Sequence, residues 1–395
     1  MKSFPVLPIL LIFFTMLPVT MIVPVFKDMI KDRLGGDNLS VSFFMSTAML
    51  GSFLFSPIAG FLSDKTQTRK WFIVVFAFLD GVSFFLLTKI TDLAWLQFLR
   101  FLEGGFHIFV IGLLLALLVD RENDKQNERF FQKGILLGLG GMFLSLGVGL
   151  GSPLGFLGKK NPLLPFYVAG GIMIAIGLIS LFFLKDYPFH HTSQVTFSGW
   201  KLAISQNPLI LIPSLFNFID RFTVGFFVTS FNLHLREDLK MHPGQVGLFL
   251  SLVLIPMSLL SYPFARLAQR WGAFLLMLIG SVIYGLALAI AGSLTSILSL
   301  AITLMISGIG AGVMFVPSMI LASKLAPKGY NASVMAGFTG FGSIGFMLGP
   351  VVSVLLERFL SQNYENSFPI LSGIFGGLEI LVVLLTLPFY KKLWK

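Results

Sequence analysis

The sequence contains no cysteine, so disulfide bonds, thiolate metal sites and cysteine nucleophiles are excluded from the outset. Charged residues are also scarce, at 12% of the chain, whereas ordinary globular domains carry about 25%. The H-E-x-x-H, nucleophile-elbow and Walker patterns of hydrolases and nucleotide-binding enzymes are missing too. The pair His190-His191 has no obvious set of further ligands around it. We therefore expect neither an enzyme, nor a metal site, nor a cofactor.

Apolar residues take the place of the missing charges. Hydrophobic residues make up 55% of the 395 residues, with 44 Phe and a mean hydropathy of +0.88. Apolar stretches of roughly 20 residues recur along the chain, and each is long enough to cross a hydrocarbon core of about 30 Å. The sequence predicts an all-α membrane protein with about twelve transmembrane helices. The predicted spans are 7–26, 42–62, 71–91, 94–119, 134–158, 163–184, 208–233, 245–265, 272–291, 297–323, 331–356 and 367–390.

A polar stretch over 185–207 separates two equal sets of six spans. We predict an N-terminal six-helix bundle over 1–184, a cytoplasmic linker over 185–207 and a C-terminal six-helix bundle over 208–395. Short echoes between the halves indicate internal duplication, because Gly147-x3-Gly151 in the fifth span matches Gly345-x3-Gly349 in the eleventh. Two parallel repeats of this kind place a substrate site at their interface near the bilayer midplane.

The formal net charge of +10 comes from Lys and Arg residues in short loops between the apolar runs. These residues are not concentrated in one patch, as they would be in a nucleic-acid binder. Most of these cations fall on one side, so both termini are predicted to be cytoplasmic. The first apolar run has no small-residue cleavage site after it and is predicted to be a retained span. We expect a monomer in a bacterial inner membrane, with lipid around it and no nucleic-acid partner.

The loop after the second span carries the residues Gly60, Asp64, Lys65 and Arg69 in the order Pro57-Ile-Ala-Gly-Phe-Leu-Ser-Asp-Lys-Thr-Gln-Thr-Arg-Lys. This segment resembles the loop signature G-x-L-a-D-r-x-G-r-r/k of the major facilitator superfamily. The resemblance implies close helix approach at Gly60 and an Asp64 that accepts from a helix N-terminus and pairs with basic residues, latching the cytoplasmic ends. Gln67 stands where the family has Gly, which predicts a less tight turn. The alternative is a charged loop that only obeys the positive-inside bias.

In the fourth span, Arg100, Glu103 and His107 fall at i, i+3 and i+7, so they share one helix face. The segment Arg100-x3-Gly104 also resembles the R-x-x-q-G signature of the same superfamily. Turning these groups toward lipid costs several kcal/mol, so we expect them to face protein or a water-filled cavity. Two interpretations stay open: Glu103 and His107 carry a proton, or Arg100 and Glu103 form a structural ion pair beside a polar His107.

The seventh span carries Asp220 and Arg221 near its middle, with Asn217 about one turn earlier. The resemblance implies that spans one, four, seven and ten line a central cavity, with these charges opposite those of the fourth span. The pattern fits a binding or coupling site, or an ion pair between the halves. Asp80 and Glu379 also lie at mid-depth, in helices that the resemblance implies are peripheral supports. For Asp80 local bonding and proton relay stay open, and Glu379 is interpreted as structural.

The fifth span contains Gly147, Gly151 and Pro153 in an arrangement similar to the antiporter signature of drug-exporting members, with the proline displaced by one position. Small residues permit close, slidable helix packing and the proline introduces a bend. A generic glycine-rich packing face is the alternative.

The function predicted from these features is secondary active transport by alternating access, most similar to the drug:proton antiporter branch. Its expected form is proton-coupled efflux of a small amphipathic molecule. The rivals are a proton-coupled uptake symporter for a sugar, organic acid or other metabolite, and a lipid or lysolipid translocator. The predicted proton-coupling residues are Glu103, Asp220, Asp80 and His107. The predicted cavity residues are Arg100, Asn217, Arg221, Phe106 and Thr20.

Overall fold

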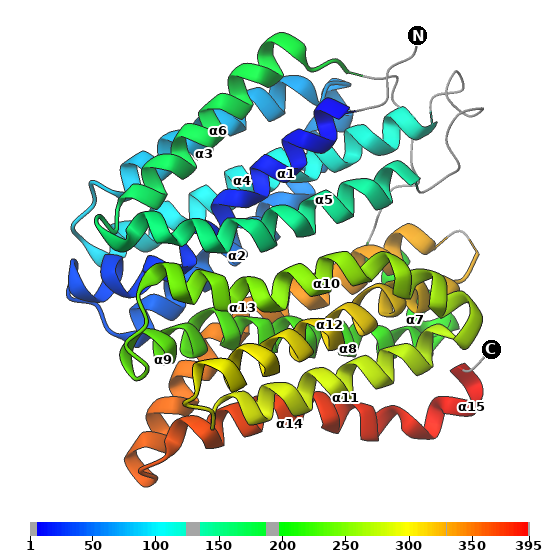
Figure 1. Cartoon of the computed structure of the whole chain (residues 1–395). Coiled ribbons are helices and arrows are strands. Elements are labelled where there is room, and N and C mark those ends of the chain that lie inside the picture. The colour runs from blue at the N-terminus through cyan, green and yellow to red at the C-terminus, as the bar shows by residue number, and fades with distance from the viewer. Residues whose placement is uncertain (1–5, 124–134, 187–196, 329, 394–395) are drawn as a thin grey trace. The chain divides into compact units, whose positions relative to one another are not determined.

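The computed structural model describes residues 6–123, 135–186, 197–328 and 330–393, and nearly all of them are helical (Figure 1). The helices of the first half are α1 (Val6–Met21), α2 (Asn38–Thr66), α3 (Lys70–Leu87), α4 (Leu93–Asn123), α5 (Ile135–Gly151) and α6 (Leu164–Phe183). Those that follow are α7 (Phe197–Gln206), α8 (Leu211–Phe226), α9 (Asn232–Glu237), α10 (Pro243–Trp271), α11 (Ala273–Ala291), α12 (Ile297–Leu325), α13 (Asn331–Asn363), α14 (Ser367–Thr386) and α15 (Tyr390–Leu393).

Within the described residues, 12 helical segments are long and apolar enough to cross a membrane, which confirms the predicted set of spans. The helix ends extend beyond the apolar runs where a cap is available. For example, α2 begins at Asn38 rather than 42, because the Asp37 side chain accepts a hydrogen bond from the Ser40 backbone N–H at 2.8 Å. Hydropathy therefore predicts the part of a helix that lies in lipid, whereas the capping residue determines where the helix begins.

The chain forms two compact units, each built around six of the long helices. The first unit comprises Met1–Thr192 with Met241–Ser251, and the second comprises Ser193–Lys240 with Leu252–Lys395. Part of the predicted linker 185–207 is helical, since α7 covers Phe197–Gln206, and its residues 187–196 lie outside the described part.

Glycine contacts hold α1 and α5 together in the first unit. A Cβ atom added at Gly147 would collide with the carbonyl oxygen of Phe13, and one at Gly151 with that of Leu17. These glycines sit one helical turn apart, as do the two carbonyls, so the backbones of the two helices touch over a full turn.

The second unit repeats this contact between α8 and α13. Here a Cβ at Gly345 would collide with the carbonyl oxygen of Phe218, and a Cβ at Gly349 with that of Phe222. The predicted echo of Gly147-x3-Gly151 in Gly345-x3-Gly349 is thus the same packing device in both bundles.

A second glycine crossing is also duplicated. Gly81 of α3 lies against Gly170 of α6, and Gly285 of α11 lies against Gly376 of α14, with each glycine facing the other's carbonyl oxygen. The two bundles are therefore pseudo-symmetric at the level of individual residues.

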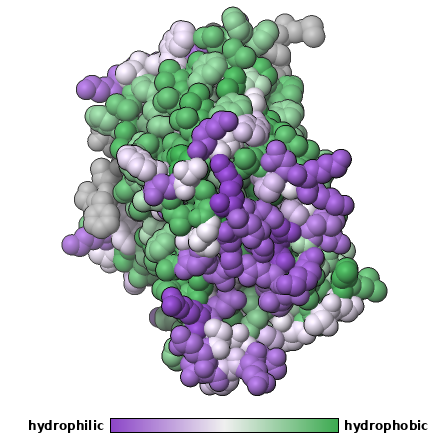
Figure 2. All heavy atoms as spheres, turned by 90° about the vertical axis from the view of Figure 1, so that its left-hand side faces the viewer, coloured by the Kyte–Doolittle hydropathy of each residue, from purple (hydrophilic) through white to green (hydrophobic). Residues whose placement is uncertain are grey.

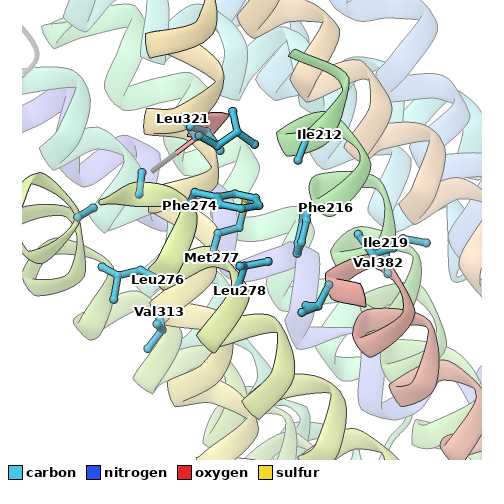
Figure 3. Close-up of a cluster of buried hydrophobic side chains, with 14 residues drawn as sticks. Ile212, Phe216, Ile219, Phe274, Leu276, Met277, Leu278, Val313, Leu321 and Val382 are labelled. Atoms are coloured by element: carbon cyan, nitrogen blue, oxygen red, sulfur yellow. The ribbon is translucent and has the colours of Figure 1, made fainter. Parts of the chain in front are cut away.

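Side chains of α8, α11, α12 and α14 form the core of the second unit (Figure 3). Phe216 projects from α8 toward Phe274 and Met277 of α11, and Val382 of α14 joins them. These side chains are at most 4% exposed. Their packing fixes the position of α8 relative to α11, and α8 carries the buried polar residues Asn217, Asp220 and Thr223.

The outer surface is apolar where lipid is expected. Phe182 is 72% exposed and Leu298 is 71% exposed, values that a water-facing surface does not favour for side chains of this size. Figure 2 looks onto the helix ends on the left of Figure 1, where hydrophilic residues gather and hydrophobic residues cover the flanks. The chain is an integral membrane protein with polar helix ends.

Candidate functional site

Four ionisable side chains meet inside the first unit, and we call them the α3–α4 cluster: Asp80 of α3 with Arg100, Glu103 and His107 of α4. All four are buried, Asp80 completely. Glycine at position 104, directly after Glu103, lets α4 lie against the Ala48 carbonyl of α2. This close crossing turns the charged face of α4 away from lipid, as the sequence predicts.

The cluster consists of two linked pairs. The Arg100 Nη1 group donates to Glu103 Oε2, and the guanidinium carbon lies 4.9 Å from the centre of the Phe44 ring. His107 Nδ1 lies 2.8 Å from Asp80 Oδ2. The first pair was among the predicted alternatives. The second joins two helices, and no spacing within the sequence could have revealed it.

Each member of the Asp80–His107 pair keeps one atom without a hydrogen-bond partner among the described residues, Asp80 Oδ1 and His107 Nε2. Such unpaired buried atoms are costly, and these two atoms are positions at which a proton can be added to the pair. Two carboxylates and one guanidinium leave one negative charge in the cluster, which a protonated His107 cancels.

Ligand atoms of Asp80, Glu103 and His107 lie within 4.8 Å of one another, a spacing that suits a metal ion as well. However, Arg100 donates to the Glu103 carboxylate that a metal ion would need. The donor set therefore fits proton exchange better than it fits a divalent cation.

Asp80 joins α3 to α4, an example of the local bonding that the sequence left open beside a proton relay. Asp80 is fully buried against His107 of α4, whereas the next residue, Gly81, faces α6. Asp80 thus belongs with the α4 residues and not with a separate helix surface.

In the second unit, Asp220 and Arg221 lie side by side on α8. Arg221 Nε is 3.6 Å from Asp220 Oδ2, and the guanidinium carbon lies 4.5 Å from the centre of the Phe315 ring. The Asp220 side chain is almost fully buried, whereas 27% of the Arg221 side chain is exposed. The pair is therefore open on its arginine side.

Asp220 also lines a small cleft of about 180 Å³. Its lining residues are Phe216, Asn217, Asp220, Met277, Met314, Phe315 and Ser318. Asn217 donates through Nδ2 to the Phe338 carbonyl at 2.7 Å, which leaves its Oδ1 without a partner among the described residues. The predicted neighbours Asn217 and Asp220 therefore share one mixed polar and apolar recess.

A further group lies deeper in the second unit, and we call it the carboxyl–hydroxyl cluster: Glu379 of α14, Thr223 of α8, and Ser281 and Tyr284 of α11. Ser281 donates to Glu379 Oε2 at 2.7 Å, and Thr223 Oγ1 lies 3.1 Å from Glu379 Oε1 and 3.2 Å from the Tyr284 hydroxyl. The sequence placed Glu379 at mid-depth but gave no sign of these partners, because they come from two other helices.

Two predicted cavity residues are engaged in packing. The Thr20 hydroxyl donates to the Val148 carbonyl of α5 at 2.6 Å, so it ties α1 to α5. Phe106 stacks at an angle on Phe76 of α3, with ring centres 5.7 Å apart.

Gln67 does not loosen the loop after α2. It adopts the left-handed conformation, with φ 54° and ψ 36°, and closes α2 by donating its backbone N–H to the Ser63 carbonyl. Gln67 therefore adopts a conformation that is sterically unfavourable for residues other than glycine. The expectation of a less tight turn is wrong.

The expected close approach at Gly60 is not found either. A Cβ atom there would meet no heavy atom of the described residues within 4 Å, whereas one at Gly51 would collide with the Phe101 carbonyl of α4. The close α2–α4 contact is two to three turns earlier in the helix.

Arg69 is the buried centre of the loop. It pairs with the buried Asp120 of α4, donates to the Ser63 hydroxyl at 3.0 Å and lies 3.4 Å from Asp64. Asp64 is exposed, so Asp120 supplies the main counter-charge that the resemblance assigned to Asp64. Lys65 reaches only the edge of the loop, 6.0 Å from the centre of the Phe61 ring.

Asp186 caps the start of α3. Its Oδ1 accepts hydrogen bonds from the backbone N–H groups of Arg69 and Lys70, both at 2.9 Å, and its Oδ2 accepts from the Thr68 hydroxyl at 2.7 Å. Negative charge at a helix N-terminus is stabilising. This is the role that the resemblance implied for Asp64, and sequence reasoning missed it because Asp186 is more than a hundred residues away.

At Pro153 the fifth span changes character. α5 ends at Gly151, and Ser152–Lys159 continues as a tighter 3-10 segment with Pro153 in its first turn. The proline therefore ends the α-helix there instead of bending it. His190 and His191 lie outside the described residues.

The sequence matches the family profile of the Major Facilitator Superfamily over residues 9–233 and 213–392. The chain belongs to that superfamily. An uncharacterized MFS-type transporter of Methanocaldococcus jannaschii is 25% identical over 391 residues, 93% of this chain and 96% of the relative.

Two further similarities bear on function and fold. The multi-drug resistance efflux pump PmrA of Streptococcus pneumoniae is 23% identical over 365 residues, 89% of this chain and 88% of the pump. The crystal structure of the nucleoside transporter NupG superposes with a TM-score of 0.80 at 15% identity, covering 97% of this chain and 98% of that one. The superfamily fold of two six-helix bundles is thus shown, and the chain is a membrane transporter.

Proposed function

We propose that this transporter is a proton-coupled exporter of small amphipathic molecules, of the drug:proton antiporter branch, working by alternating access. The α3–α4 cluster carries the proposal, because it holds Asp80, Glu103 and His107 together in the interior of a transmembrane bundle. Ionisable groups at this depth are costly and typically serve ion or substrate pathways. Imidazole is also the side chain that titrates near neutral pH.

In the proposed cycle, a proton on His107 cancels the remaining negative charge of the cluster and its loss restores that charge. Because the two protonation states differ by a full charge inside the bilayer, they favour different conformations of the transporter. In the second unit, Asp220 and Asn217 line the proposed substrate recess, and Arg221 borders it through Phe315. In the first unit we propose Arg100, which pairs with Glu103, as a further substrate-binding residue.

Export is supported by the similarity to an efflux pump and by the fifth-span signature at Gly147, Gly151 and Pro153. The recess of the second unit brings the polar groups of Asn217 and Asp220 together with apolar side chains, a combination that suits an amphipathic molecule. We further propose that the carrier is a monomer with bundles over 1–184 and 208–395 and a cytoplasmic linker over 185–207. Both termini lie in the cytoplasm of a bacterial cell in this proposal. The loop around Arg69 and Asp120 is the conformational latch of the carrier.

Proteoliposomes provide the test. With ethidium as an amphipathic probe, an imposed pH gradient across the membrane should drive ethidium accumulation on the acidic side. His107→Gln and Asp220→Asn should lose this gradient dependence, whereas Glu365→Gln, an acid in an exposed loop, should retain it. Ethidium flux by the wild type that ignores the gradient would end the coupling proposal. Accumulation of ethidium by energised cells would replace export with uptake.

A further inference from the structure

Glu379 is a buried acid that forms no ion pair within the described residues. Its side chain is fully buried and contacts the hydroxyl groups of Ser281 and Thr223. The Ser281 hydroxyl also lies 3.4 Å from the backbone carbonyl oxygen of Glu379. A carboxylate transferred to such an interior costs several kcal/mol unless a cation pairs with it. Hydroxyl groups alone do not supply that cation.

The surrounding helices bring few charges. Asp220 and Arg221 of α8 already pair with each other, and Tyr284 of α11 is a neutral hydroxyl donor. Of α13, which also packs on α14, the charged residues are Glu357 and Arg358, about two turns beyond the Gly349 contact with α8. An ionised Glu379 would therefore place a second negative charge near Asp220.

Counting hydrogens around Thr223 gives an independent argument. Its Oγ1 lies 2.8 Å from the Asp220 carbonyl oxygen, 3.2 Å from the Tyr284 hydroxyl and 3.1 Å from Glu379 Oε1. A hydroxyl has one hydrogen to donate and two lone pairs to accept with. The Asp220 carbonyl is the nearest of the three oxygens, so we assign the Thr223 hydrogen to it.

The two remaining contacts of Thr223 must then be donated to it. Tyr284 has a hydrogen to give, and Glu379 has one only as a carboxylic acid. With a proton on Oε1, every oxygen of the cluster is satisfied, because Ser281 donates to Oε2. Without that proton, the Asp220 carbonyl and the Glu379 carboxylate would compete for the single Thr223 hydrogen, and one of the two contacts would lack one.

We propose that Glu379 is a proton-binding site of the transporter, a neutral carboxylic acid held by Thr223 and Ser281 while Asp220 is ionised. The bound proton sits on Oε1, and its release would leave two neighbouring acids ionised in one bundle. Protonation at Glu379 and ionisation at Asp220 therefore depend on each other. The protonation state stands on the second unit alone, and its part in the cycle rests on the proposed function.

Infrared difference spectroscopy of the full-length protein in lipid tests the protonation state without any transport assay. The carbonyl band of a protonated carboxyl should be present in the wild type at neutral pH and lost in Glu379→Gln. It should persist in Asp220→Asn and in the exposed-acid control Glu365→Gln. An identical band in the wild type and Glu379→Gln would overturn the proposal.

A milder variant guards against loss of folding in Glu379→Gln. Ser281→Ala removes the hydrogen bond to Oε2 but keeps the acid, so the same band should move to higher frequency. An unmoved band in folded Ser281→Ala protein would also contradict the proposal.

Transport of ethidium then separates the two proposals. With a pH-sensitive dye in the vesicle lumen, Glu379→Gln should move fewer protons per ethidium than the wild type. If the Glu379 band is found but ethidium is not carried with protons, the proposed function fails and the proton site stands. If coupled transport is normal and the band is unaffected by Glu379→Gln, the proton site fails and the function stands.

Discussion

The two units bury acids in different ways. In the α3–α4 cluster, Asp80 and Glu103 are balanced by ionisable nitrogen groups of His107 and Arg100, and two buried atoms are left without partners. In the carboxyl–hydroxyl cluster, Glu379 is surrounded by neutral hydroxyl groups that satisfy it completely if it is protonated. The helix packing around them is nevertheless duplicated, as the glycine crossings show. Similar glycine crossings thus surround a cluster with ionisable counter-groups and a cluster in which a carboxyl group meets only hydroxyl groups.

The sharpest test of this difference is to remove one carboxylate from each cluster. Glu103→Gln leaves the buried Arg100 without its partner and should destabilise the protein by about 3–5 kcal/mol. Glu379→Gln should cost less than about 1 kcal/mol, because the amide can donate to Thr223 and accept from Ser281 as the acid does. Thermal unfolding of the purified protein measures both. Equal losses would mean that the clusters are not different in charge.

The duplicated packing makes a prediction of its own. Gly147→Ala in the first unit and Gly345→Ala in the second should each destabilise by about 1–3 kcal/mol, because the added methyl group strikes a backbone carbonyl. Gly141→Ala is the matched control on α5, where a Cβ would meet nothing within 4 Å of the described residues. A loss in only one unit would break the symmetry argument.

Because His107 Nε2 in the α3–α4 cluster has no partner among the described residues, we expect transport to depend on pH. Imidazole titrates between about pH 5 and 8, so wild-type ethidium flux should change across that range and His107→Gln should flatten the change. We expect a loss in rate of about tenfold at the optimum, equal to about 1.4 kcal/mol. Glu365→Gln, which changes an exposed acid, should keep the pH profile. A profile unchanged by His107→Gln would remove that residue from coupling.

The smallest effect is expected at the loop after α2. Gln67→Gly relieves a left-handed conformation that costs a non-glycine residue about 1–2 kcal/mol, but it gives up the Gln67 Nε2 bond to the Asp64 carbonyl and adds chain entropy. The net gain should be below about 1 kcal/mol in the same unfolding assay. A marked loss of stability would show that the glutamine side chain matters more than the turn.

The sequence predicted the spans and the repeat well, because a bilayer demands long apolar runs and hydropathy records them directly. It also identified Arg100, Glu103, His107, Asp220 and Asn217 as buried polar groups, since such residues are conspicuous inside apolar runs. The hydrogen-bond partners of these groups could not be predicted. Pairs such as Asp80–His107 and Thr223–Glu379 join helices, and their contacts depend on the rotation of each helix about its axis.

The errors in the loop have a related origin. Family resemblance located the motif, but the contacts moved from Asp64 to Asp120 and Asp186, which lie far along the chain. Gly60 and Gln67 were judged from the usual residue at each position, whereas the surrounding backbone decides whether a glycine is needed. Interhelical geometry is therefore the part that sequence reasoning could not supply.

The hydrogen bonds of Asp186 have a consequence for the region that follows α6. Asp186 lies three residues after the end of α6, and its carboxylate fixes this stretch to the backbone of Arg69 and Lys70 at the start of α3. Arg69 in turn pairs with Asp120 of α4. One arginine therefore joins the ends of three helices, α3, α4 and α6, through its backbone and its side chain.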